Sequence, residues 1–268
     1  MMNWTLVRRY ALLIDLVLLV VVWHIAAVRL DANFLPTPLE VMTRFFEELQ
    51  ADLLNHTLVS GQRVLLSIVA GVMLAAPLAI LTAQIRVLDQ FITPLMYFLY
   101  PAPKIVFLPL IIVFLGLGDS SKVFLIGLII FFQVFVIVRD AAAQVRDETL
   151  ESINVLGANG WHRLRYVYIP VSIPAIMTAL KVSAGTAIAV LFIAETIATN
   201  TGLGYYIMNA WGRFAYTNMY AGILAMSLLG LALFVSFDWL EKRLTRWKNS
   251  TRSQRSADSA RNSRTISV

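Results

Sequence analysis

The sequence has no cysteine and few charged residues. Of its 268 residues, 14% are charged and 59% are hydrophobic, whereas soluble domains contain about 25% charged and about 45 to 50% apolar residues. This composition argues against a water-soluble globular protein. The absence of cysteine also excludes disulfides, thiolate metal sites and cysteine catalysis.

Signatures of catalysis and of ATP binding are missing as well. No G-x-x-x-x-G-K-[ST] phosphate loop occurs, and the nearest segment, 116–122, lacks the required glycine spacing. His24, His56 and His162 are scattered, so no His/Asp/Glu cluster has the spacing of metal ligands. No nucleophile and base are visibly paired. We therefore predict no catalytic residue, no metal and no cofactor in this chain.

Long apolar runs dominate what is present. Each is about 17 to 25 residues long, enough for a helix to cross a hydrocarbon layer of roughly 30 Å. The runs cover about 10–28, 64–83, 91–115, 122–138, 173–194 and 219–240. We expect an all-α integral membrane protein with about six spans. The first run stays attached rather than being a cleaved signal, because Val28, Arg29 and Leu30 follow it in place of a small-residue cleavage site.

The basic residues predict the orientation of these spans. Most arginines and lysines fall in segments that are internal if the N-terminus is cytoplasmic, and the positive-inside rule then places both termini in the cytoplasm. The outer segments hold only Arg29, Arg44, Arg63, Lys122 and Arg213. Topology thus explains the net charge of +6 without a nucleic-acid partner. We expect a transmembrane domain over 1–248 and a disordered basic tail over 249–268 that touches anionic lipid.

The outer segment between the first two spans contains a helix signal. Pro38 is followed by apolar residues at helical spacing, interleaved with glutamates, which predicts a short amphipathic helix at the outer interface. This helix either docks an external partner or caps the bundle, and the sequence favours neither.

The longest internal loop, about 139–172, lies between spans four and five. Asp147 is expected to cap a helix over 148–157, with Gly157 as the left-handed residue after it. Apolar Leu150, Ile153 and Leu156 recur at i, i+3 and i+6 on one face. The other face offers Glu148, Glu151, Ser152 and Asn154 to water or to a partner. Pro170 and Pro174 predict a rigid exit into span five, because they discourage the linker from relaxing into a continuous flexible helix.

This loop resembles the cytoplasmic motif of permease subunits of ABC importers. That motif reads Glu-Ala-Ala, three residues, Gly, nine residues, Ile-x-Leu-Pro. The present chain has Glu151-Ser152-Ile153, three residues, Gly157, nine residues and then Val167-Tyr168-Ile169-Pro170. The spacing is preserved, although four of the motif's side chains differ. Further segments are similar to the nitrate, sulfonate and taurine group of these permeases: 34–38, 101–104, 108–110, 156–158, and Ala194-Glu195 followed by 202–205.

The resemblance implies a fold, partners and a mechanism. The fold would be that of a type I ABC importer permease with a cytoplasmic coupling helix between spans four and five. The partners would be a second permease copy, an ATP-binding cassette subunit that holds ATP and Mg, and an external solute-binding protein. The substrate would be a small anion such as a sulfonate, taurine or nitrate, although similar permeases also carry vitamin precursors. The residues expected to couple to the ATPase are Glu148, Leu150, Glu151, Ser152, Ile153, Leu156, Gly157, Ala158, Trp161 and Pro170.

Charges inside spans are costly and therefore invite functional hypotheses. Pro101 and Pro103 predict a break in span three next to Lys104. Glu195 ends span five on the outer side. We predict that these four residues line or gate the translocation path, with Lys104 and Glu195 as an ion pair.

Three other ionisable residues lie within the spans, and none of them requires a role in transport. Lys181 and Asp238 lie near the cytoplasmic ends of their spans, where their side chains can reach water. Asp15 is well inside the first span and has no partner that the sequence identifies.

Two alternatives from other classes stay open. A channel would move ions without an ATPase. A secondary transporter would show two halves with repeated topology and broken helices in matching places, and the break in span three has no obvious counterpart.

Overall fold

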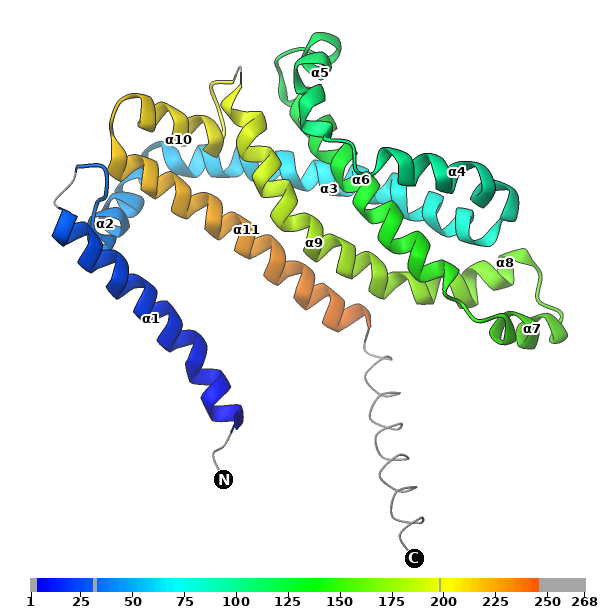
Figure 1. Ribbon diagram of the computed structural model, residues 1–268. Helices are drawn as coiled ribbons and strands as arrows, with labels where there is room; N and C mark the ends of the chain where they lie inside the picture. Colours follow the sequence, from blue (N-terminus) through cyan, green and yellow to red (C-terminus); the bar gives the residue numbers. More distant parts are fainter. Residues whose placement is uncertain (1–3, 31–32, 198, 246–268) are drawn as a thin grey trace, which may run out of the picture. The chain divides into compact units, whose positions relative to one another are not determined.

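The computed structural model describes residues 4–30, 33–197 and 199–245, and this part of the chain is helical (Figure 1). The α-helices are α1 (Trp4–Leu30), α2 (Pro38–Glu48), α3 (Leu54–Gln84), α4 (Arg86–Leu99), α5 (Leu108–Leu115), α6 (Asp119–Ala143), α7 (Asp147–Val155), α8 (Gly160–Arg163), α9 (Ile169–Thr196), α10 (Leu203–Gly212) and α11 (Tyr216–Leu244). Short π-helical turns at Leu49–Leu53 and Leu164–Tyr168 and a 3-10 turn at Lys104–Phe107 join some of them. The expected disordered tail, 249–268, lies outside the described residues.

Five helical segments are long and apolar enough to cross a membrane, and a sixth is counted if α4 and α5 form one span. The five are Leu13–Leu30 within α1, the segment Pro38–Gln84, α6, the segment Gly160–Thr196 and α11. Each contains or overlaps one of the predicted runs. The prediction of an all-α protein with about six spans is therefore confirmed.

The third predicted span is the irregular one, as its prolines indicate. Instead of one helix over 91–115, the chain forms α4 and the pair of the 3-10 turn and α5, and the two axes differ by 83°. Pro101 and Pro103 lack an N–H to continue the ladder of α4, so the helix ends just before them at Leu99. The predicted break is confirmed.

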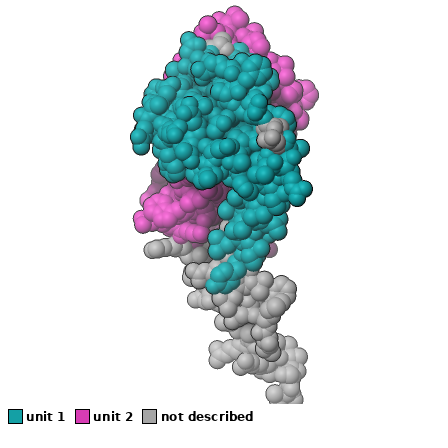
Figure 2. Space-filling view, turned by 90° about the vertical axis from the view of Figure 1, so that its left-hand side faces the viewer, with its two compact units in different colours: residues 1–62, 191–229 teal, residues 63–190, 230–268 magenta. Residues whose placement is uncertain are grey.

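The chain divides into two compact units, which Figure 2 shows in different colours. Unit 1 comprises 1–62 and 191–229, and unit 2 comprises 63–190 and 230–268. Helices α3, α9 and α11 each contribute residues to both units.

Unit 1 contains the predicted short helix of the outer segment. Helix α2 starts with a capping box, in which Thr37 accepts from the Glu40 N–H and the Glu40 carboxylate accepts from the Thr37 N–H. Val41 and Phe45 are buried, whereas Leu39 is 74% exposed, so the helix is amphipathic. Its entry is fixed because the Trp23 indole N–H of α1 donates to the Pro36 carbonyl (3.1 Å).

Unit 2 is held by close helix contacts and by ion pairs near helix ends. A Cβ built on Gly71 of α3 would lie 3.0 Å from the Gly127 carbonyl oxygen of α6, so glycine permits this approach. Asp89 of α4 pairs with Arg139 of α6 at 2.6 Å. Lys181 and Asp238, predicted to reach water near the ends of their spans, are both partly exposed and lie 3.7 Å apart.

Candidate functional site

The predicted coupling helix exists as α7, which begins at Asp147 and ends at Val155. Its N-terminus corrects one expectation. Arg146 is the N-cap and makes no side-chain capping bond, while Asp147 is the first helical residue and does not cap. Asp147 and Glu148 lie in the first turn, where negative charge is favourable to the helix dipole.

The C-terminus of α7 has the predicted left-handed glycine. Gly157 has a φ of +79°, a conformation that costs other residues more than glycine. The Gly157 N–H donates to the Asn154 carbonyl (2.9 Å) and the Ala158 N–H to the Ile153 carbonyl (3.1 Å). These two bonds form a Schellman motif, which satisfies carbonyls that the helix end leaves free. The chain therefore reverses at a defined position.

The apolar side chains around this reversal face outwards. Leu150 and Ile153 are half-buried, as a packed face requires. Leu156, expected on the same face, is instead 84% exposed, because it follows the last helical turn. Val155 is 87% exposed and Trp161 is 61% exposed. The chain thus exposes three apolar side chains near the Gly157 turn, Val155 and Leu156 before it and Trp161 after it.

The exit from the loop is helical and passes through Pro170 and Pro174. Asn159 caps α8 by accepting from the His162 N–H (3.0 Å), and helical structure then continues from Gly160 to Thr196. The π-helical turn Leu164–Tyr168 precedes Pro170, and the Ile169 N–H reaches back to the Leu164 carbonyl. The wider turn makes room for a residue that would distort a regular α-helix. The loop is therefore joined to α9 by a continuous helical rod.

This rod is also attached to α3 at its start. The Gln84 side-chain amide, at the end of α3, donates to the Gly160 carbonyl at 2.8 Å. In Figure 1, α7 and α8 follow in the segment after the end of α6. The loop is thus an ordered part of unit 2.

Lys104 stabilises the break in the third span. Its ammonium donates to the carbonyls of Leu99 (2.9 Å), Tyr100 (2.7 Å) and Ala102 (3.2 Å), which lie at the end of α4 and just after it. The ammonium also lies 4.3 Å from the centre of the Phe132 ring, a favourable cation–π geometry. Lys104 is only 8% exposed, so its charge is held inside unit 2.

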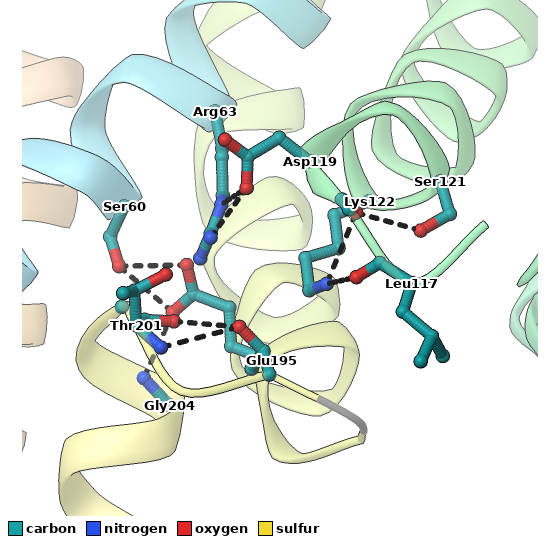
Figure 3. A network of polar contacts seen from close by, with 12 residues as sticks. Ser60, Arg63, Leu117, Asp119, Ser121, Lys122, Glu195, Thr201 and Gly204 are labelled. Atoms are coloured by element: carbon teal, nitrogen blue, oxygen red, sulfur yellow. Dashed lines mark hydrogen bonds and ion pairs between the residues drawn. The ribbon is translucent and has the colours of Figure 1, made fainter. Parts of the chain in front are cut away.

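In unit 1, the Glu195 side chain likewise forms hydrogen bonds at the end of a helix (Figure 3). Its side chain is fully buried. Its carboxylate accepts from the Ser60 hydroxyl (2.8 and 2.9 Å to its two oxygens) and from the Gly204 N–H (2.9 Å). Ser60 in turn accepts from the Leu203 N–H at 2.8 Å. A carboxylate thus lies at the N-terminus of α10, where the dipole favours it.

The predicted Lys104 to Glu195 pair stays a prediction. The two residues belong to different units, and the partners described above come from within their own units. Ser60 and His56 were not predicted as site residues, although the His56 ring accepts from the Gly202 N–H at 3.0 Å. Their signal was the i, i+4 spacing of Asp52, His56 and Ser60, which places all three on one helical face.

The remaining expectations concern metals and Asp15. Within the described ranges, no three His, Asp or Glu side chains are grouped as a metal site requires. Asp15 is exposed on α1.

Comparison with known proteins adds to this geometry. Residues 67–247 match the family profile described as binding-protein-dependent transport system inner membrane component. The taurine transport system permease protein TauC of Escherichia coli (strain K12) is 30% identical over 255 residues, which are 91% of this chain and 92% of TauC. The riboflavin transport system permease protein RibX of Chloroflexus aurantiacus is 32% identical over 241 residues, 88% of this chain and 90% of RibX.

Solved structures share the fold. The inward-facing MetNI methionine ABC transporter superposes with a TM-score of 0.62 at 17% identity, covering 74% of this chain and 99% of that one. A bacterial ABC transporter for the polysaccharide alginate gives a TM-score of 0.58 at 14% identity, covering 90% of this chain and 99% of the other.

Proposed function

Because the chain belongs to the family of binding-protein-dependent transport inner membrane components, we propose that this permease moves a small anion such as a sulfonate, taurine or nitrate by alternating access. It is the multi-pass inner-membrane subunit of an ABC importer, and ATP is bound and hydrolysed by a separate subunit. We further propose how the chain couples to that subunit, which residues line its translocation path and which substrate it carries.

The anion class is supported by the names of the relatives and by one charge. TauC is a taurine permease, and SsuC of Bacillus subtilis, named as a putative aliphatic sulfonates permease, is 29% identical over 222 residues. Lys104 supplies a buried cation in the broken span. RibX, a riboflavin permease, is equally similar, so a substrate assay has to decide between the classes.

The geometry of α7 carries the proposed coupling. The helix ends in a defined Schellman turn and exposes Val155 and Leu156 to a partner. We assign α7 and the following turn to the groove of the ATPase, with Glu148, Glu151, Ser152 and Asn154 on its polar face. Since a continuous helical rod joins this loop to α9, displacement of α7 would move the span as a rigid element.

The cycle requires two coupled copies of the membrane bundle. We propose a homodimer in which each copy docks one ATPase subunit, while the external binding protein delivers the solute. Closure of the ATPase pair on ATP would push the two α7 helices together and rock the bundles. Pro101, Pro103, Lys104 and Glu195 are assigned to the path or its gate, with Lys104 at the break and Glu195 positioning α10.

The test is ATP-dependent uptake by the reconstituted transporter, which contains this chain, its ATPase subunit and its binding protein. Leu156→Asp places a charge on an exposed position, so it is expected to weaken ATPase capture by about tenfold or more without unfolding the chain. Removal of 148–157 should abolish uptake. Leu39→Asp is the matched control, because Leu39 is also exposed (74%) but lies on α2. Normal ATPase capture and normal uptake in both loop variants would contradict the proposal.

A further inference from the structure

A cavity of about 380 Å³ lies beside the break in the third span. Its walls include Tyr100 and Lys104 from the break, Phe132 and Gln133 from α6, and Val190 from α9. The volume falls within the range of about 300 to 1,000 Å³ that is typical of small-molecule sites. Gln133 is near the middle of α6 (Asp119–Ala143), so the cavity lies at the depth of the spans rather than at their ends.

One wall of the cavity carries a positive charge. The ammonium of Lys104 has neutral carbonyl oxygens of Leu99, Tyr100 and Ala102 as its hydrogen-bond partners. These contacts satisfy its N–H groups but leave its net charge in place. A buried charge in apolar surroundings is costly by itself and favours a counter-ion. The cavity is therefore electrostatically suited to an anion.

A second wall contains the side-chain amide of Gln133, and among the described residues only its N–H group has a hydrogen-bond partner. The Gln133 side-chain N–H donates to the Thr186 hydroxyl of α9 at 3.2 Å. Its carbonyl oxygen is buried, and none of the described residues donates to it. Buried amide oxygens are rarely left without a donor. Because a threonine hydroxyl both donates and accepts, the amide can also turn and offer its N–H group instead.

We propose that this cavity is a substrate subsite of the permease itself. It would take a small organic anion that carries a second polar group. The anionic group would lie beside Lys104, and the second group would hydrogen-bond to Gln133, with Thr186 orienting the amide. The inference rests on the proposed function and deepens it, because it assigns part of the substrate selection to this subunit rather than to the binding protein alone.

Taurine and ethanesulfonate are matched probes, since they share the sulfonate and differ by the amino group. Uptake of each is measured in the complete reconstituted transporter. Gln133→Leu removes the hydrogen bond and should reduce the taurine rate several-fold more than the ethanesulfonate rate. Gln133→Glu places a carboxylate where the second group binds, so it should lower the ethanesulfonate rate several-fold, whereas the ammonium of taurine pairs with the carboxylate and the taurine rate should fall much less. Ser183→Ala, on the same helix α9 but outside the cavity lining, is the control and should match the unsubstituted protein.

The outcomes separate the subsite from the proposed function. Suppose that the unsubstituted transporter shows ATP-dependent uptake. If both Gln133 variants then keep its rates and its taurine to ethanesulfonate ratio, the subsite alone is overturned. If the unsubstituted transporter takes up neither sulfonate, both the anion class and the subsite are overturned. If a Gln133 variant fails to assemble with the ATPase subunit, Thr186→Val decides, because it only releases the amide and should change the same ratio in the same direction as Gln133→Leu.

Discussion

Single residues hold the start of α10 in place. The N–H groups of Gly202, Leu203 and Gly204 are satisfied by His56, Ser60 and Glu195, respectively. Backbone groups at a helix start have no partner within the helix, so these side chains of α3 and α9 take that role. Gly202 has a φ of +103°, which glycine adopts without steric cost. The buried carboxylate of Glu195 thus positions a helix, in addition to any part it takes in the path.

Gly204 provides the first test at this scale. A Cβ at this position would lie 2.6 Å from the Glu195 Cβ and 2.7 Å from the Phe192 carbonyl oxygen. Gly204→Ala should therefore separate α10 from α9 and destabilise the protein by about 1–3 kcal/mol. The midpoint of thermal unfolding in detergent, followed by tryptophan fluorescence, measures the effect.

Gly212→Ala is the matched control for this substitution. Gly212 ends the same helix, and a Cβ there would meet nothing within 4 Å. Its midpoint should stay near that of the unsubstituted protein. Equal midpoints for the two alanine variants would show that the close approach at Gly204 is relaxed in solution.

Among the elements, α7 and the rod that follows it have the clearest mechanical design. The helix is short, so its own hydrogen bonds do not stabilise it strongly. Its end is defined by the Schellman turn at Gly157, and its exit by the cap at Asn159 and the continuous helix to α9. Such an element transmits a displacement only if the turn keeps its shape.

Substitution of Gly157 tests this requirement. No atom lies within 4 Å of a Cβ built there, so any effect comes from the φ of +79° rather than from crowding. Gly157→Val should cost about 1–2 kcal/mol in the turn and raise the number of ATP molecules hydrolysed per solute taken up. Gly157→Asn tolerates the left-handed conformation better and should stay close to normal. Identical coupling ratios for valine and asparagine would refute the role of the turn.

The contact between α4 and α6 offers a second test at this scale. Asp89 and Arg139 lie 2.6 Å apart and are both partly exposed, so solvent screens the pair. Measured in detergent by thermal unfolding, Asp89→Asn, Arg139→Gln and the double variant should give a coupling energy of about 0.5–1 kcal/mol. Strictly additive effects would mean that the pair contributes nothing in solution.

At the scale of the whole molecule, the arrangement of charge predicts which end of each span faces the cytoplasm. The basic residues concentrate in the segments that are internal when the N-terminus is inside. The predicted orientation would place α7 where a cytoplasmic ATPase can reach it and α2 where an external binding protein can. The proposed coupling and delivery would thus depend on the same topology.

The absence of cysteine makes this orientation directly measurable. Single cysteines at Ser152→Cys on α7 and Leu39→Cys on α2 would each be unique in the chain, and both positions are exposed. In intact cells, a membrane-impermeant maleimide should label the Leu39 variant only. Permeabilisation should make the Ser152 variant reactive as well. Labelling of Ser152→Cys from outside would invert the proposed topology and remove the coupling role of α7.

Much of the fold and of the coupling loop was predictable from the sequence by itself. Apolar runs of membrane length determined the spans, because a lipid environment requires continuous apolar helices. Pro101 and Pro103 determined the break, and Gly157 determined the end of α7, because backbone sterics act over a few residues.

Only the tertiary structure decided which groups meet. Ser60 and Glu195 are 135 residues apart in the chain, and no local pattern pairs them. The carbonyls at the end of α4 that the Lys104 ammonium contacts could not be read from the local sequence pattern either. Pro170 was predicted to make the exit of the loop rigid, and the π-helical turn that precedes it and lets helical structure continue was not predicted. Local rules act through neighbouring dihedral angles, while these outcomes depend on packing between distant elements and on the hydrogen bonds that buried groups must find there.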